Sequence, residues 1–367
     1  MHCQWLSVEN STSDVDYLYC AAVVENVIGQ RLNVCLRCVD DLTSEDVLET
    51  VEFVFGCVLI NVFAFLGLVT TSINLAVLSR CNITRDSSNI LLVSLSVADF
   101  LFCLTIPFSH SKCVLVHLFE VQTALKINIY IFEYCSAFIR VFYNCSISMV
   151  GVICVQRFLV VTIPFRSSSM LSPLRMKVVS IFVYVANILL FSPAYFSFTH
   201  DYDFSQRYGD FIPVLKPTHF YKNNYAAINI HLGIVYNIAV LGTSLLLTLV
   251  LTPATAIYLW MLINRRKKLT QRKCSFEPQV AKTLLAICSI GLVIYGPTIG
   301  YNSATIFLPQ YSVLTTSYQV FLIISDCCGC VCATVNFIIY VTMSTKFRQR
   351  YKVILYRISL GKCNVRK

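Results

Sequence analysis

TLLAICSIGLVIYGPTIGYNSATIFLPQYSVLTTSYQVFLIIS, residues 283–325, contains no charged side chain. A helix needs about 20 apolar residues to cross the hydrocarbon core of a membrane, so this stretch is long enough for two crossings. Pro297, the triplet YNS at 301–303 and Pro309 predict the turn that separates them. The stretch therefore predicts a membrane protein rather than a soluble domain.

The whole chain shares this composition. Of its 367 residues, 56% are hydrophobic and 13% are charged, whereas a soluble domain carries about 25% charged residues. Seven apolar runs are long enough to span a membrane, at about 53–79, 88–114, 129–156, 178–199, 234–263, 281–303 and 316–343. We therefore predict an all-α membrane protein, with a seven-transmembrane helix bundle at 53–343 between an N-terminal tail, 1–52, and a C-terminal tail, 344–367.

The distribution of charge predicts the orientation. Residues 1–52 hold ten acidic residues and two arginines. Placing this tail outside the cell puts four other segments inside, at 80–87, 157–177, 264–282 and 344–367. These segments hold 21 of the 29 Lys and Arg residues, and cytoplasmic loops are enriched in both. We expect a multi-pass protein of the plasma membrane with an extracellular N-terminus.

Both tails carry candidate modification sites. Asn10 begins the sequon Asn-Ser-Thr, which predicts glycosylation on the outer side. STKFRQRYKVILYRISL, residues 344–360, repeats apolar side chains at helical spacing among Lys and Arg, which predicts a short amphipathic eighth helix on anionic membrane lipids. Cys363 is a candidate for palmitoylation or a plain cysteine. Disulfides are plausible, with their pairing open, among cysteines on or near the outer face: Cys3, Cys20, Cys35, Cys38, Cys113 and Cys135.

Polar residues inside the spans are functional hypotheses, because each must find a partner in lipid. Asp99 lies about 16 Å into the second span at 1.5 Å per residue. Asn74, Ser146 and Asn336 lie at comparable depths in other spans. Together they predict a buried polar cluster around a cation or waters, with unrelated helix–helix hydrogen bonds as the alternative.

Arg140 and Asp326 form a second hypothesis, because both fall in the outer third of their spans. A lone arginine deep in a membrane helix costs about 2.5–3.5 kcal/mol, which an opposite charge at matching depth would offset. The two side chains therefore pair with each other or open to bind a ligand. The alternative is that Arg140 reaches the outer interface by itself.

Five motifs stand in order along the chain: INLAVL at 73–78, SLSVAD at 94–99, VQRFLVVTIP at 155–164, IYGP at 294–297 and NFIIY at 336–340. With the seven spans and the outside N-terminus, they resemble the rhodopsin-like (class A) G-protein-coupled receptors over about residues 53–357. The chain looks like a divergent member, of an invertebrate peptide-like or chemosensory orphan branch. The resemblance implies that an extracellular ligand activates a heterotrimeric G protein.

The resemblance also implies roles for named residues. It implies an activation switch and G-protein contact at Arg157, Tyr258, Pro297 and Tyr340, in which Arg157 holds the third span near the sixth at rest. It implies a sodium and water cluster at Asn74, Asp99, Ser146 and Asn336. It implies a ligand pocket that contains Arg140, Tyr143, Tyr295 and Asp326.

The chain departs from the family pattern at several of these landmarks. Gln156 replaces the acid beside Arg157, so a salt bridge that restrains the arginine is missing. Tyr295 stands for a tryptophan in the sixth span, and Phe337 stands for the proline in the seventh. The usual disulfide of the family has no match, since Cys135 is three residues off its expected place and no cysteine occurs between 155 and 273.

Ligand and function can be narrowed by exclusion. No lysine occurs between 283 and 345 to hold a retinal, and Arg140 beside Asp326 suits a peptide or a small carboxylate-bearing molecule. His-Glu-x-x-His and Gly-x-Ser-x-Gly are absent, so we predict no enzyme, and no cofactor other than a sodium ion at Asp99. A cytoplasmic loop explains the basic run at 265–268 without a nucleic-acid partner. A divergent channel or transporter, or a receptor that no longer couples, remains the alternative.

Overall fold

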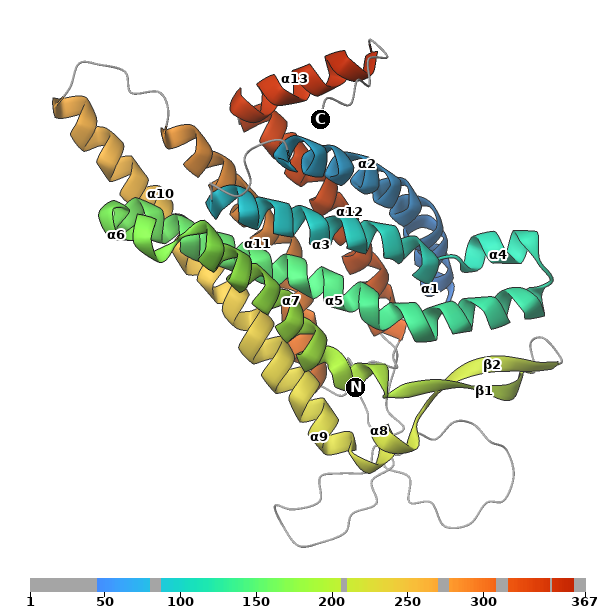
Figure 1. The fold of residues 1–367 in the computed structure, drawn as a ribbon. Coiled ribbons are helices and arrows are strands. Elements are labelled where there is room, and N and C mark those ends of the chain that lie inside the picture. Colours follow the sequence, from blue (N-terminus) through green and yellow to red (C-terminus); the bar gives the residue numbers. More distant parts are fainter. Residues whose placement is uncertain are drawn as a thin grey trace, which may run out of the picture.

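A computed structural model describes residues 45–79, 87–205, 210–269, 277–307, 316–343 and 345–359. They form a bundle of long helices, with a β-hairpin at one end and a short helix, α13 (Thr345–Ser359), at the other (Figure 1). We call these the hairpin end and the α13 end. Asn10 and Cys363, the two candidate modification sites, lie outside the described residues.

Seven long helical rods make up the described bundle. They are α1 (Glu45–Val51) continued by η1 (Glu52–Leu59) and α2 (Ile60–Ser79); α3 (Ser87–Ser109); α5 (Val121–Thr162); α7 (Pro173–Tyr195); α9 (Tyr225–Asn229) continued by η2 (Ile230–Gly242) and α10 (Thr243–Leu269); α11 (Glu277–Phe307); and α12 (Thr316–Met343). Short helices α4 (Lys112–Leu118), α6 (Pro164–Met170) and α8 (His219–Asn223) lie in the connections. Six rods are long and apolar enough to cross a membrane, and α11 completes the set by contacting α5, α10 and α12. The predicted fold class is confirmed.

Several of the approximate predicted helix limits differ from those in the structure. The triplet at 301–303 is helical rather than a turn, because the ring of Tyr301 stacks on Phe321 with centroids 4.0 Å apart and α11 continues past it. The second span ends at 109, soon after Pro107, instead of at 114. The fourth span ends at 195, soon after Pro193, instead of at 199. In the last two cases proline removes a backbone hydrogen-bond donor near the end of the helix.

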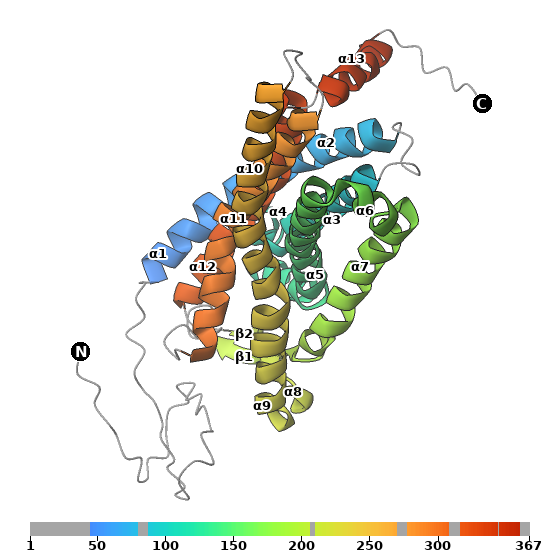
Figure 2. The same ribbon diagram turned by 90° about the vertical axis from the view of Figure 1, so that its left-hand side faces the viewer.

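The central helix of the bundle is α5, which contacts α3, α7, α10 and α11. Figure 2 shows these neighbours around it. Its side chains Ile139, Met149 and Ile153 are at most 1% exposed and belong to one continuous apolar core. Because lipid is as apolar as this core, close packing and internal hydrogen bonds, rather than exclusion of water, hold such helices together.

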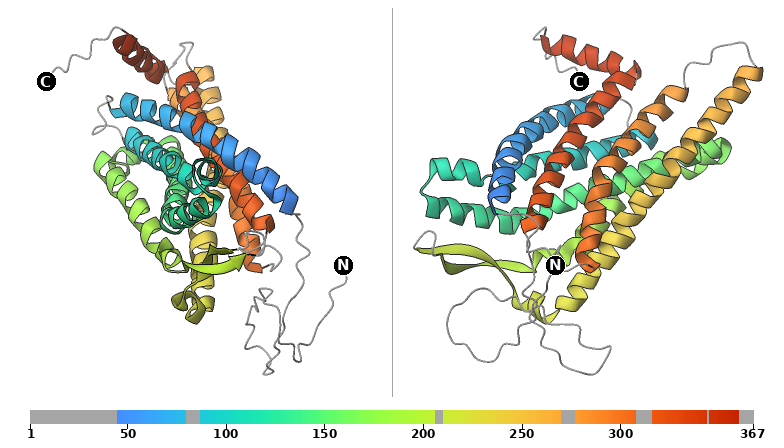
Figure 3. Two further views of the ribbon diagram at one scale, coloured as in Figure 1. Left: turned by 90° about the vertical axis from the view of Figure 1, so that its right-hand side faces the viewer. Right: turned by 180° about the vertical axis from the view of Figure 1, so that it is seen from behind.

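A hairpin that the sequence analysis did not predict lies across the N-terminal part of α5 (Figure 3). Its strands, β1 (Phe198–Ser205) and β2 (Asp210–Pro217), pair in antiparallel register. His200 Nδ1 lies 2.5 Å from Glu133 Oε2, and the imidazole packs on the ring of Tyr130. On the exposed face, a hydrogen bond from Lys216 holds the pKa of Asp201 below its ordinary value. The hairpin is therefore fixed to α5 by specific side-chain contacts.

At the opposite end, α13 packs one face on α12. The buried ring of Phe347 contacts the rings of Phe337 and Tyr340, with centroids 6.2 and 5.6 Å apart. Tyr351 packs on Phe337 as well, with centroids 5.6 Å apart, whereas Arg348 is exposed. The predicted amphipathic eighth helix is confirmed as a helix with an apolar face and a basic face.

Two disulfides cross-link the described helices. Cys57 of η1 bonds to Cys113 of α4, and Cys154 of α5 bonds to Cys288 of α11. Cys113 belongs to the set expected near the outer face, but its partner lies in the first spanning helix, and Cys135 is free. Cysteines in apolar spans usually act as small packing residues, so no sequence pattern predicted the other three cysteines in disulfides.

Candidate functional site

Polar side chains from α3, α5, α11 and α12 meet inside the bundle in three successive groups between the hairpin end and the α13 end. A membrane-embedded polar group must be satisfied within the protein. Mostly apolar helices therefore turn their few polar residues toward one another.

The first group is an ion pair between Arg140 of α5 and Asp326 of α12. The distances Nη1–Oδ1 and Nη2–Oδ2 are both 2.7 Å, the bidentate arrangement that arginine and carboxylate favour. His110 Nε2, just beyond α3, lies 3.3 Å from Asp326 Oδ2. The side chain of Asp326 is 2% exposed and that of Arg140 is 24% exposed. The carboxylate is therefore enclosed, whereas part of the Arg140 side chain is accessible.

The second group is a triangle of hydroxyls one helical turn further along α5. The Tyr143 hydroxyl lies 3.2 Å from Thr298 Oγ1 and 3.1 Å from Ser325 Oγ, which lie 2.9 Å from each other. Gly329 makes room for this tyrosine, since a Cβ there would lie 2.8 Å from its ring and 2.9 Å from the ring of Phe102. Threonine and serine in apolar helices usually form hydrogen bonds with their own backbone, so no sequence pattern predicted Thr298 and Ser325 in this triangle.

The third group surrounds Asp99 of α3. Ser146 donates a hydrogen bond of 2.7 Å to Oδ1, and Asn336 Nδ2 donates one of 2.9 Å to Oδ2. The hydroxyl of Tyr295 lies 3.1 Å from Ser146 Oγ, so this predicted ligand contact reaches into the third group. Asn74 of α2 is buried, but among the described residues no hydrogen bond joins it to Asp99. The structure thus brings three of the four predicted cluster residues into direct contact.

The predicted switch residues lie toward the α13 end. Arg157 is 9% exposed at the end of α5, and Tyr340 of α12 is 3% exposed. Tyr258 is half-buried on α10, and Pro297 lies within α11. Gln156 donates to Ser87 Oγ at 3.3 Å and to Ser88 Oγ at 3.4 Å. The residue that replaces the family's acid therefore fixes α5 to the start of α3.

A separate polar network, missed by the sequence analysis, joins α5 to α7 and η2. Asn144 donates to the Tyr236 hydroxyl at 2.9 Å, and that hydroxyl donates to Asn187 Oδ1 at 2.9 Å. Asn187 Nδ2 lies 3.4 Å from Ser148 Oγ. Asparagines within apolar runs were the available signal, because an amide in a membrane helix must find partners.

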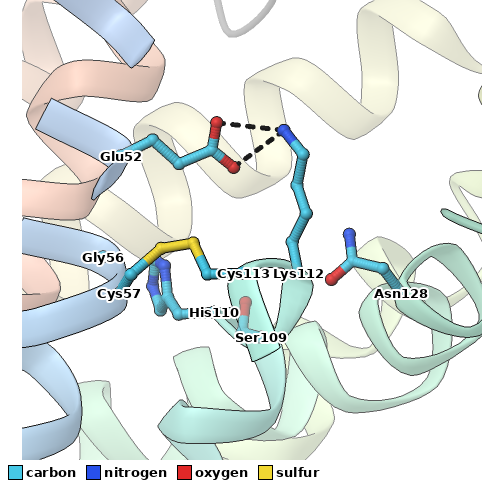
Figure 4. Close-up of a pocket in the computed structure, with 8 residues that line it drawn as sticks. All are labelled: Glu52, Gly56, Cys57, Ser109, His110, Lys112, Cys113 and Asn128. Atoms are coloured by element: carbon cyan, nitrogen blue, oxygen red, sulfur yellow. Dashed lines mark hydrogen bonds and ion pairs between the residues drawn. A yellow bond between two sulfur atoms is a disulfide. The ribbon is translucent and has the colours of Figure 1, made fainter. Parts of the chain in front are cut away.

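A small pocket lies at the hairpin end between η1, α4 and α5 (Figure 4). Lys112 Nζ lies 3.0 Å from both carboxylate oxygens of Glu52, and the Cys57–Cys113 bond forms one wall. His110 lines this pocket as well as contacting Asp326, so the pocket lies next to the first polar group.

Comparison with protein families identifies the bundle. The family model described as "7 transmembrane receptor (rhodopsin family)" matches residues 73–340. This range contains all three polar groups and most of the bundle. No curated protein matches the chain.

Proposed function

The chain belongs to the rhodopsin family of seven-transmembrane receptors, and from that premise we propose how its buried polar residues receive a ligand and pass the signal on. As a family member it is a G-protein-coupled receptor in a membrane, which answers an extracellular ligand by activating a heterotrimeric G protein. The observation that carries the proposal is the succession of polar groups from Arg140, near the hairpin end, to Arg157, near the α13 end.

The hairpin end faces the exterior at the plasma membrane in this proposal. Helices α2, α10 and α12 end at the other end of the bundle, and the sequence segments 80–87, 264–282 and 344–367, which follow or include these helix ends, are rich in Lys and Arg. Cytoplasmic loops collect these residues. The α13 end then offers a basic surface to the G protein, and the exposed basic face of α13 lies against anionic lipid.

The ligand carries a carboxylate, as a peptide or a small acid does. Arg140 lies near the hairpin end and keeps 24% of its side chain exposed, so a ligand carboxylate can accept a hydrogen bond from one of its guanidinium nitrogens. A zwitterionic ligand would also offer an ammonium group to Asp326. Either interaction weakens the Arg140–Asp326 ion pair that joins α5 to α12. The hydroxyl triangle around Tyr143, one helical turn deeper, then rearranges.

A sodium ion suits the group around Asp99. The Asp99 carboxylate and the Ser146 hydroxyl offer the oxygen ligands that hard cations favour. The buried Oδ1 atoms of Asn74 and Asn336 accept no hydrogen bond from the described residues, so a cation would satisfy them. When bound, the ion would supply positive charge beside the carboxylate and favour the closed packing of α2, α3, α5 and α12.

At the α13 end, Arg157 acts as the switch. At rest it is enclosed by the bundle, and the uncharged side chain of Gln156 holds this part of α5 to α3. Agonist shifts the population toward an arrangement in which α11 moves away from α5. Arg157 then contacts the G protein, and Tyr258 and Tyr340 pack beside it in the active arrangement. Pro297 is the point at which α11 pivots.

Nucleotide exchange on purified G proteins tests this proposal without a known ligand. Membranes containing the unliganded receptor should raise exchange above that of empty membranes for at least one G-protein class. Arg157→Ala should abolish the excess, whereas Arg166→Ala, an exposed arginine on the neighbouring α6, should retain it. Exchange at the level of empty membranes for every class, or equal loss in both variants, contradicts the proposal and favours a receptor that no longer couples.

A panel of acidic peptides and small carboxylates tests the ligand class. The Arg140→Ala receptor should lose its response to an acidic agonist found with the natural chain. Arg140→Lys should retain part of it, because the charge remains but the bidentate fork does not. An unchanged response in Arg140→Ala removes the carboxylate from the proposal and leaves the coupling mechanism untouched.

A further inference from the structure

The bond between Cys154 and Cys288 joins the two helices that the activation mechanism separates. The Cα atoms are 6.6 Å apart, within the range that a disulfide bridges. Each cysteine is 2% exposed. The pair therefore lies in the packed interior between α5 and α11, not on the surface.

The surrounding packing explains why the two sulfurs meet. Gly291 lies one turn along α11 from Cys288, and a Cβ there would lie 3.2 Å from a methyl of Val150. The glycine thus lets α11 approach α5 closely. Cys154 Sγ also lies 3.7 Å from Thr252 Oγ1 on α10. Close approach of the backbones, rather than flexibility of the side chains, brings the thiols together.

Position along the helix sets the chemical environment of this pair. Cys154 lies one turn from Arg157, toward the end of the bundle that we assign to the cytoplasm. Disulfides there are rare in ordinary cells, and those that occur are mostly transient or redox-sensing. The Cys57–Cys113 bond lies at the hairpin end, which we assign to the oxidising exterior.

We propose that Cys154 and Cys288 are a redox modification site whose disulfide locks the receptor at rest. The oxidant is a peroxide: one thiolate attacks the O–O bond to give a sulfenic acid and water, and the second thiol displaces a second water as the S–S bond forms. Two equivalents of a cytosolic thiol such as glutathione reverse the step and become a disulfide themselves. The locking part rests on the proposed function, because it requires α11 to leave α5 on activation.

A disulfide holds two sulfurs about 2 Å apart, so the oxidised pair forbids separation of the helices at this depth. The reduced pair offers only packing contacts, which helix movement can replace. Oxidation should therefore lower G-protein activation without removing any residue that contacts ligand or G protein.

The covalent bond is tested by cutting the chain between Leu269 and Glu277 with an inserted protease site. Every variant carries Cys274→Ser to remove the thiol of that segment. After peroxide, cleavage and a denaturing gel without reductant, the two fragments should run as one band, and dithiothreitol should separate them. Cys288→Ser or Cys154→Ser should release the fragments. Cys330→Ser is the matched control: this buried cysteine of α12 contacts Cys103 across the same cut, and its loss should keep the single band.

Nucleotide exchange on the same membranes tests the lock. Peroxide should lower exchange roughly tenfold, a factor typical of coupling between sites, with recovery in dithiothreitol and no effect in Cys288→Ser. Fragments that separate under all conditions overturn the bond itself. A reversible bond with exchange unaffected overturns the lock, and with it the outward movement of α11 in the proposed function. A receptor that does not couple to G protein at all gives a different result, because nucleotide exchange is then absent in both the oxidised and the reduced state.

Discussion

The pair Arg140–Asp326 predicts an asymmetry between two alanine substitutions. Removing one partner of a buried ion pair costs about 3–5 kcal/mol, because the other charge is left unpaired. Arg140→Ala leaves a carboxylate that is 2% exposed, with His110 at 3.3 Å as its remaining polar contact among the described residues. We therefore expect Arg140→Ala to lower the free energy of unfolding by about 3–5 kcal/mol.

Asp326→Ala should cost less than this range, because a long cationic side chain can turn its charged end toward water. Arg140 is 24% exposed and lies near the hairpin end, so this route is open to it. When both side chains are replaced, no unpaired charge is left in the interior. The double variant Arg140→Ala/Asp326→Ala should therefore be more stable than Arg140→Ala alone.

Thermal unfolding in detergent measures these differences, with a dye that reacts as the buried cysteines become exposed. We expect a melting temperature several degrees lower for Arg140→Ala than for Asp326→Ala, with the double variant between the former and the natural chain. Equal losses in the two single variants, or strictly additive losses in the double variant, would refute the reasoning from unequal burial.

Two further predictions concern the deeper groups. Gly329→Ala should cost about 1–3 kcal/mol by overpacking, since its Cβ would press on two rings at 2.8 and 2.9 Å, whereas Gly300→Ala, with no atom within 4 Å of its Cβ, should not lower the melting temperature. The natural receptor should melt at a higher temperature in sodium chloride than in choline chloride, and Asp99→Asn should abolish that difference. A sodium effect that persists in Asp99→Asn would place the ion elsewhere.

Much of the bundle could be predicted because one physical demand dominates it. A spanning helix must be apolar over about 20 residues, and polar residues inside it must meet partners. Asp99, Ser146 and Asn336 were grouped from depth alone, and hydrogen bonds join them in the structure. Depth also placed Arg140 opposite Asp326. Their roles in signalling remain predictions.

Other features depend on side-chain directions and loop contacts that one sequence does not reveal. The hairpin at 198–217 depends on contacts with a distant helix, such as His200 with Glu133. The disulfides depend on which face each cysteine occupies, and apolar spans rich in cysteine give no preferred pairing. The Tyr295 hydroxyl contacts Ser146 of the third group instead of the ion pair. The direction of this side chain depends on the rotation of α11 about its axis, which one sequence does not reveal.

The length of α5 has a mechanical consequence. Its 42 residues span about 63 Å at 1.5 Å per residue, roughly twice the 30 Å of hydrocarbon that a helix must cross. A stiff helix that extends beyond the membrane acts as a lever. A tilt of the part of α5 beneath the hairpin would also move the part that bears Arg157. A large ligand that contacts the hairpin and a small ligand that binds beside Arg140 would therefore both tilt α5.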